Sequence, residues 1–335
     1  MAQQAQTSKT SRKILLLGLA IVAVCVVYSG AWYVAATTLQ GRLERIFKDQ
    51  NPWRANVTCE NQDLRGYPFR IGVFCDTLSF DDPKRGISGT FGALRSAAQV
   101  YAPGHIIWEL DGPGQVRTTN GELISLEWSD LRSSVVTGLT AIKRSSVEAK
   151  QFHATMTPPT GLPMAEVRSP SIETHVRANG DDLDYAAIGR DIELSLDGGK
   201  FTLPLFSASV DMTLADRADL MGFRGGETDL HGLKTEIRKV AIALGEKQEI
   251  SASGPLSVDD KGRLSGNLRL EINGVSEIAK TLKDFAPEAA DNIDTGDKVL
   301  IALFGGDQKG SAEFKIRKGV VTLGIFPIYT IPPIR

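Results

Sequence analysis

The chain has 335 residues, of which 42% are hydrophobic and 23% charged, a composition typical of globular proteins. Its 38 Lys and Arg residues against 40 Asp and Glu residues give a formal net charge of −2, and the basic residues form no cluster. Because nucleic-acid binding needs clustered cations that displace counterions, we exclude nucleic acid as a partner.

A long apolar run near the N-terminus predicts a transmembrane helix. The run 14–36 contains no charged residue and is long enough to cross the roughly 30 Å hydrocarbon core of a bilayer as a helix. Basic residues precede it, and the aromatic residues Trp32 and Tyr33 lie near its far end. Because positive charge stays on the cytoplasmic side, we expect residues 1–13 to form a cytoplasmic tail and the rest of the chain to face outward.

A cleaved signal peptide is the competing interpretation of this run. The apolar region of a signal peptide spans about 7 to 15 residues and ends at a cleavage site with small residues. Here the run is longer, and the nearest small-residue site, Val34-Ala35-Ala36, follows two aromatic residues. We therefore favour a permanent single-pass signal-anchor and leave cleavage as the alternative.

The segment 37–50 predicts an amphipathic continuation of the helix, which we call the stalk. Apolar residues recur there at helical spacing, and charged residues fill the opposite face. The helix should end before Asn51-Pro52, because proline cannot continue a helix. We expect the stalk to pack on the protein's own outer domain, and packing on a partner helix is the alternative.

From residue 51 to residue 335 the dominant pattern has period two, which is typical of β-strands. Alternating runs such as Ile71–Cys75 are separated by turns such as Asp260-Lys261-Gly262. Short, closely spaced strands favour antiparallel pairing over β–α–β units. We therefore expect a mainly β domain with minor α content, built on curved antiparallel sheet.

Two stretches inside this region predict helices, and a third predicts an internal boundary. Apolar residues of 275–285 fall on one helical face ahead of Pro287, whereas Leu183–Ile188 is a weaker helical candidate. The Pro-rich stretch 156–163 has strand-rich sequence on both sides. The sequence leaves open whether this stretch separates two similar β halves, and whether they form one sheet or two.

Two cysteines flank the most distinctive motif of the chain. Cys59 and Cys75 lie outside the membrane run, and an oxidising compartment allows such a pair to close a disulfide; two unrelated buried thiols are the alternative. Between them lies Gly66-Tyr67-Pro68-Phe69-Arg70, whose glycine permits a sharp turn and whose proline favours an extended start to the next strand. We interpret the motif as the turn of a disulfide-stapled first hairpin. A recognition surface near the membrane, using Tyr67 and Arg70, is the alternative.

The sequence contains no familiar catalytic motif, nucleotide-binding loop or metal-ligand spacing. The four histidines, His105, His153, His175 and His231, are scattered, and two cysteines alone do not complete a tetrahedral metal site. We therefore predict no metal, no cofactor and no enzymatic activity. A catalytic site assembled in space from distant residues stays the alternative.

The order of these features resembles one family, the domain of unknown function 2125 of Gram-negative bacteria. The matching parts are the anchor ending in Ala31-Trp32-Tyr33, Cys59, the 66–70 motif and Cys75, together with the blocks 254–266 and 321–333. The resemblance implies a membrane-anchored envelope protein and carries over no catalytic residue. A looser similarity to AsmA-like envelope proteins implies lipid handling along apolar β-sheet grooves.

We expect a non-catalytic protein of the inner (cytoplasmic) membrane whose periplasmic domain holds lipid or another apolar ligand in a sheet groove. The candidate ligand-binding residues are Phe201, Leu203, Leu205, Phe206, Phe314, Ile316, Val321 and Leu323. Ordinary core packing is the competing role for all of them. The alternative functions are a scaffold or assembly partner for another envelope protein, and a hydrolase with an unrecognised site.

Overall fold

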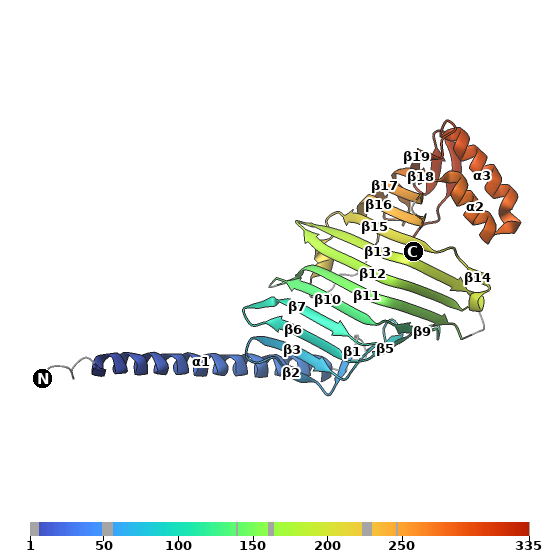
Figure 1. The fold of residues 1–335 in the computed structure, drawn as a ribbon. Coiled ribbons are helices and arrows are strands. Elements are labelled where there is room, and N and C mark those ends of the chain that lie inside the picture. Colours follow the sequence, from blue (N-terminus) through green and yellow to red (C-terminus); the bar gives the residue numbers. More distant parts are fainter. Residues whose placement is uncertain are drawn as a thin grey trace.

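The computed structural model describes residues 7–48, 56–138, 140–159, 164–222, 230–245 and 247–334 (Figure 1). One long helix precedes a large sheet, and two shorter helices lie near the end of the chain (Figure 1). The helices are α1 (Thr7–Lys48), α2 (Val275–Phe285) and α3 (Ala290–Leu303), with short 3₁₀ helices η1 (Asp197–Gly199), η2 (Ala218–Met221) and η3 (Pro287–Ala289).

The 21 strands of the described residues belong to a single antiparallel sheet, so the expected mainly β fold is confirmed. Pairing runs without a break across β11 and β12, on either side of the stretch 156–163, so both halves share this sheet. Residues 160–163 of that stretch lie outside the described residues. The strands are β1 (Asn56–Glu60), β2 (Asp63–Arg65), β3 (Arg70–Cys75), β4 (Thr77–Asp82), β5 (Ile87–Phe91), β6 (Leu94–Gln99), β7 (Ala102–Leu110), β8 (Gly114–Arg117), β9 (Leu123–Glu127), β10 (Asp130–Thr137), β11 (Ile142–Thr157), β12 (Ala165–Asn179), β13 (Asp182–Leu196), β14 (Phe201–Thr202), β15 (Phe206–Leu214), β16 (Lys234–Gly245), β17 (Gln248–Val258), β18 (Leu264–Asn273), β19 (Lys309–Arg317), β20 (Val320–Leu323) and β21 (Phe326–Thr330).

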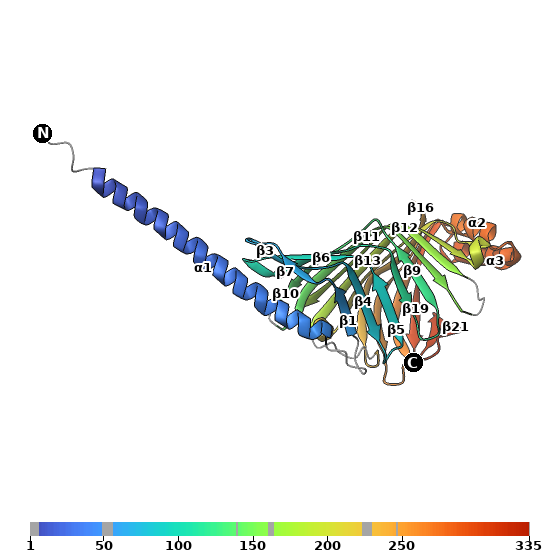
Figure 2. The same ribbon diagram turned by 90° about the horizontal axis from the view of Figure 1, so that it is seen from below.

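The early strands are bent at one common level of the sheet, which we call the crease. After β3 the chain continues into β4 across Asp76 alone, and β9 continues into β10 across Trp128 and Ser129. The halves pair separately, because β3 pairs with β6 while β4 pairs with β5. β11 pairs with both β9 and β10, and Gln151, where φ is 49°, lies between the two paired segments. Figure 2 shows the resulting bend, with β3, β6 and β7 in one limb and β1, β4 and β5 in the other.

One face of the sheet is apolar across most of its width. A row of directly paired residues crosses the sheet from β10 to β19, and every member is apolar or glycine. Paired residues in neighbouring strands point to the same face, so these side chains form one continuous strip. The row consists of Leu131, Ala149, Ile172, Gly189, Ala208, Ile242, Ile250, Ile272 and Gly310.

Burial near the crease shows that the apolar face is the inner side of the bend. Leu110 and Ala149, whose side chains lie on the apolar face, are buried. Lys150 and Arg190, whose side chains lie on the opposite face, are exposed. On the inner side of a bend side chains converge and on the outer side they spread apart, so we call the two sides the inner face and the outer face.

The outer face is polar and carries ion pairs between neighbouring strands. Arg269 lies 3.0 Å from Glu313, and Lys239 lies 2.8 Å from Glu249. These pairs are solvent-exposed, so each stabilises the sheet by less than about 1 kcal/mol. Their main effect is to keep the outer face soluble while the inner face stays apolar.

The inner face is not sealed by a second layer across its whole width. The chain exposes 21962 Å², whereas a compact protein of its 36.2 kDa mass exposes about 13,000 Å². The projecting α1 accounts for part of the excess, and no large side chain among the described residues is fully buried. An apolar cluster of Ile272, Val275 and Ile278 forms where α2 covers one end of β17 and β18, and α3 packs against it.

The helix predictions have mixed outcomes. The helix over 275–285 is confirmed as α2, and α1 continues through the stalk as far as Lys48. The helical candidate Leu183–Ile188 is wrong, because it lies within β13. β13 is hydrogen-bonded to both β12 and β15, so its side chains alternate between the faces, with Tyr185 and Ala187 inside and Asp184 outside. Cross-strand pairing overrides the local helical preference of this short stretch.

Asp184 is the most strongly connected carboxylate of the outer face. Its residue is only 6% exposed, and its oxygens accept hydrogen bonds from Thr213 at 2.6 Å, Arg177 at 2.9 Å and Arg238 at 3.2 Å. These donors, led by Thr213, lower the pKa of Asp184 to about 2 against the opposing effect of burial. A carboxyl group whose pKa is lowered by folding stabilises the folded state above its unfolded pKa and loses that effect as pH falls through the folded pKa.

We predict that Asp184→Asn lowers the free energy of unfolding by about 2 kcal/mol at neutral pH. The difference from the unmodified protein should persist at about pH 5 and shrink between about pH 4 and about pH 2. Urea unfolding across this range measures it, with the exposed turn variant Asp260→Asn as control. A difference that stays constant down to about pH 2 would contradict the assignment.

Candidate functional site

The inner face is the candidate site, and it holds six of the eight residues proposed from the sequence. Phe314 and Ile316 on β19 pair with Leu323 and Val321 on β20. Phe206 lies on β15 and pairs with Ile192 on β13. The strands β16, β17 and β18 separate Phe206 from the other four, so these candidates form two patches of one surface.

Phe201 and the two remaining candidates lie at the end of β13, away from the main strip. Phe201 belongs to the two-residue strand β14, where it pairs with Leu196, and Leu203 and Leu205 connect β14 to β15. The side chains of Phe201 and Leu205 are exposed. They extend the apolar surface at the edge of β13 and are not part of a packed core.

Sequence reasoning missed the central part of the apolar surface. The missed residues of β11 are Val147, Ala149, Phe152 and Ala154, whose counterparts on β12 include Val167 and Ile172. Their signal is present in the sequence, since apolar residues alternate with polar ones between Val147 and Met156. The alternation shifts by one residue at Gln151, and a strict period-two reading therefore loses it there.

Aromatic side chains line the inner face of the limb that contains β4, β5 and β9. The rings of Phe80 and Phe91 are stacked at 6.1 Å, and Trp128 lies 6.4 Å from Phe91. The Trp128 indole N–H donates to the Leu110 carbonyl oxygen at 2.7 Å. This bond fixes the ring at the crease, where β9 continues into β10.

The Gly66–Arg70 motif forms a turn that docks onto α1. The Tyr28 hydroxyl donates to the Pro68 carbonyl oxygen at 2.6 Å, and the Trp32 indole N–H donates to the Arg70 carbonyl oxygen at 3.0 Å. Ser29 and Tyr67 share a hydrogen bond of 2.7 Å, and the rings of Trp32 and Tyr67 meet edge to face at 5.3 Å. Gly66 has a φ of 121°, and the Arg70 N–H donates to its carbonyl oxygen at 2.8 Å. The motif is therefore a turn, as interpreted from the sequence, and it holds the helix against the sheet. The expected stapling of the hairpin is wrong, because the turn joins β2 and β3, whereas Cys59 lies on β1, which pairs with β4.

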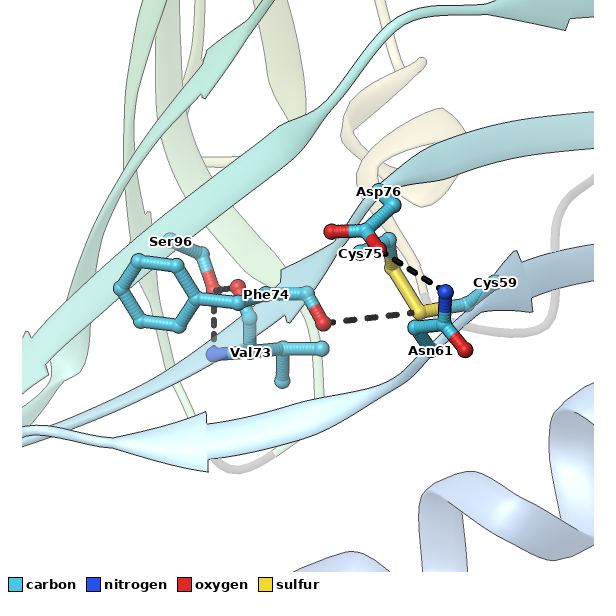
Figure 3. The surroundings of a disulfide bond; sticks show 7 residues. All are labelled: Cys59, Asn61, Val73, Phe74, Cys75, Asp76 and Ser96. Atoms are coloured by element: carbon cyan, nitrogen blue, oxygen red, sulfur yellow. Dashed lines mark hydrogen bonds between the residues drawn. A yellow bond between two sulfur atoms is a disulfide. The ribbon is translucent and has the colours of Figure 1, made fainter.

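The disulfide between Cys59 and Cys75 is confirmed and joins the two limbs of the sheet. It connects β1 with β3, with Cα atoms 5.3 Å apart (Figure 3). Beside it the Asn61 side-chain amide donates to the Asp76 carboxylate at 2.8 Å (Figure 3). The Asp76 N–H also donates to the Glu60 carbonyl oxygen at 2.9 Å. These bonds close the crease at the end of the sheet nearest α1.

Three of the histidines lie on the outer face in pairs with neighbouring polar side chains. His105 contacts the Ser134 hydroxyl at 2.9 Å, His175 contacts the Ser146 hydroxyl at 2.9 Å, and His153 contacts Glu166 at 2.7 Å. These residues stand on strands whose N–H groups are engaged in the ladder, so none of these N–H groups is aimed at a substrate oxyanion. Within the described residues, no group of three potential ligands is arranged to hold a metal ion.

Hollows of the sheet surface lie mainly on the outer face. One of about 840 Å³ crosses β16 to β19 and is lined by Glu236, Arg238, Arg269, Glu313 and Lys315 among others. Another of about 400 Å³ lies over β3, β6 and β7, where Phe74, Ile107 and Trp108 lie beside charged side chains. Both are lined mainly by outer-face residues, so they lie on the side of the sheet opposite to the apolar row.

Within the described residues, the segment Arg12–Glu44 of α1 is long and apolar enough to cross a membrane, and an 18-residue stretch of it has a mean hydropathy of 2.6. A helix of this kind near an N-terminus serves as a membrane anchor or as a signal sequence. Together with the disulfide, it indicates that the sheet is an extracytoplasmic domain.

Comparison with known families gives one match. The family model described as an uncharacterized protein conserved in bacteria (DUF2125) matches residues 32–332, which is nearly the whole chain. The chain belongs to the DUF2125 family. The range matched to DUF2125 begins at Trp32 in the docked part of α1 and contains the turn, the disulfide and all 21 strands. No curated protein and no solved structure matches significantly.

We predict that replacing the disulfide with Cys59→Ser and Cys75→Ser lowers the free energy of unfolding by about 3 kcal/mol, because the unfolded chain regains the freedom of a closed loop. The loop spans a sequence separation of 16 residues. Urea unfolding of the full chain in detergent measures the change, and a reductant should destabilise the unmodified protein equally without affecting the double variant. Equal stability of oxidised and reduced protein would show that the bond contributes nothing.

Proposed function

We propose that this DUF2125 member is a non-catalytic, single-pass protein of the inner membrane that binds the acyl chains of lipid on the inner face of its sheet. Its N-terminus would be cytoplasmic and its sheet periplasmic. The positive residues before the apolar part of α1 support this orientation, and the disulfide supports the compartment.

The observation that carries the proposal is the apolar row from β10 to β19. None of its nine residues is charged, and α2 covers the row at one end, at Ile250 and Ile272. Large exposed apolar surfaces on soluble domains mark binding sites. Each CH₂ group of an acyl chain that this surface removed from water would contribute about 0.8 kcal/mol.

The chemistry of the face favours lipid over a polar ligand. A polar ligand requires converging hydrogen-bond donors and charges, and the row offers neither. Because the face is open along one side, a lipid could place its chains on the sheet and keep its head group in water. The head group would then contribute little to recognition, and the ligand class would be defined by its acyl chains.

Two isoleucines with matching exposure on opposite faces give the test. Ile242 on the inner face is 47% exposed, and Ile107 on the outer face is 49% exposed. We predict that Ile242→Asp reduces the lipid copurifying with the full chain by about tenfold, since a carboxylate against an acyl chain costs more than about 1.4 kcal/mol.

Mass spectrometry of lipids extracted from each purified variant gives the readout. Ile107→Asp should retain the lipid content of the unmodified protein. No reproducible lipid in the unmodified protein, or equal loss in both variants, would contradict the proposal.

A scaffold function is the second candidate, and the terminal strand β21 favours it. Among the described strands β21 pairs with β20 alone, and its side chains Phe326, Ile328 and Tyr329 are exposed. A free apolar strand edge is a template for pairing with another chain. We predict that a photocrosslinker in place of Ile328 captures a specific protein in cells if this edge is used. A crosslinker in place of Lys315, on the outer face of β19, serves as control. Equal labelling at the two positions would argue against the scaffold function.

A further inference from the structure

The sheet docks onto α1 within its apolar run. The docked residues Tyr28, Ser29 and Trp32 all precede Ala36, where the apolar run ends. Tyr28 lies 14 positions beyond Ile14, which corresponds to about 21 Å along the helix axis. A hydrocarbon core of about 30 Å that begins at Ile14 therefore ends about 9 Å beyond Tyr28.

This places the docked turn at the depth of the outer leaflet. Tyr67 and Pro68 contact α1 at Tyr28 and Ser29, and Arg70 contacts it at Trp32, about 6 Å farther along the axis. No shift of the helix along the membrane normal moves the docked turn out of the hydrocarbon core, because a span ending before Tyr28 would be too short to cross the core.

The polar groups of this contact are satisfied as an apolar environment requires. The hydroxyls of Tyr28 and Ser29 and the indole N–H of Trp32 each have a hydrogen-bond partner in the turn. Inside a bilayer an unpaired group of this kind costs several kcal/mol, so such groups find partners within the protein. At a contact surrounded by water, these polar groups could bond to solvent, so complete pairing within the protein would not be needed.

A second turn extends the exposed aromatic surface beside the first. The Val100 N–H donates to the Phe69 carbonyl oxygen at 3.0 Å, which holds the turn between β6 and β7 against the Gly66–Arg70 turn. The next residue, Tyr101, is 77% exposed, and Phe69 is 68% exposed. We call Tyr67, Phe69 and Tyr101 the aromatic rim. Exposed Tyr and Phe side chains at this level of a membrane protein match the aromatic belt of the interface.

We propose that the aromatic rim inserts into the outer leaflet of the membrane that α1 spans and holds the end of the sheet that contains β3, β6 and β7 on the lipid surface. We call this placement of the sheet the seating. Arg70 follows the rim at the level of Trp32, where a guanidinium would meet lipid phosphates. Ile71 and Ala98, the first paired inner-face residues behind the two turns, would receive an acyl chain directly from that leaflet. In both views the later strands lie farther from α1, so the inner face leads away from the membrane (Figures 1 and 2).

The seating itself rests on the contact between α1 and the turn, whereas the identity of the ligand as a leaflet lipid rests on the proposed function. The test uses the full chain with Cys25→Ala in nanodiscs of phosphatidylethanolamine and phosphatidylglycerol. A nitroxide label is attached at Phe69→Cys, Tyr101→Cys or Val299→Cys. Val299 is the control, because it is 60% exposed and lies on α3, away from α1 (Figure 1).

The readout is the relative accessibility of each label to oxygen, which dissolves in the bilayer, and to a water-soluble nickel complex. We expect labels at positions 69 and 101 to favour oxygen at least about fivefold more than the label at position 299, as in the outer part of a leaflet. Equal water accessibility at positions 69 and 299 would overturn the seating.

Lipid mass spectrometry of the same detergent-purified protein separates the two claims. Membrane-buried labels without copurifying lipid would confirm the seating and contradict the lipid-binding function. Copurifying lipid with water-exposed labels would leave the function in place and overturn the seating alone.

Discussion

The structure depends on keeping apolar side chains on one side of a sheet that bends. Side chains alternate between the faces of a strand, so a shift of one residue sends every later side chain to the opposite face. On β11 the inner residues are Val147 and Ala149 before the crease and Phe152 and Ala154 after it, a shift from odd to even positions. The extra residue, Gln151, takes a positive φ and turns the strand while the apolar positions change phase.

A single layer with one apolar face follows from this arrangement. The hydrogen-bond ladder satisfies the backbone of each strand, and outer-face carboxylates such as Asp184 find donors on adjacent strands. The α2 and α3 helices cover one end of the inner face. The disulfide and the docked turn act at the other end, where they join the two limbs and fasten them to α1. The apolar surface between these two ends is the feature on which the proposed function depends.

Much of the local structure could be predicted from the sequence, because it depends on short-range patterns. Alternation predicts the strands, the uncharged run predicts α1, and spacing and capping signals predict α2. The helix α3 is missed, since Gly296 and several charged residues interrupt its apolar pattern. Leu183–Ile188 is misassigned because its pairing with β12 and β15 is not visible in the local sequence.

The candidate site was harder to predict than the fold, since it depends on which residues share a face across many strands. Phe314 and Leu323 could be grouped from the sequence because their strands are neighbours along the chain, and the two residues pair directly. Ile172 and Ile242 lie in the same row although 70 positions separate them, and only the strand register shows it. Only part of the role of the Gly66–Arg70 motif could be predicted from the sequence. Its glycine predicts a turn, but the contact of this turn with Tyr28 and Trp32 does not follow from residue spacing.

Crosslinking along β15 tests most directly whether the inner face contacts lipid. Benzophenone side chains placed singly at Ser209, Val210, Asp211 and Met212 sample the two faces alternately, because Val210 pairs with Ala187 and Val240 inside the bend. After irradiation in intact cells, mass spectrometry would identify the adducts. The account predicts lipid adducts at Val210 and Met212 and none at Ser209 and Asp211. Adducts of equal abundance at all four positions, or at none, would contradict it.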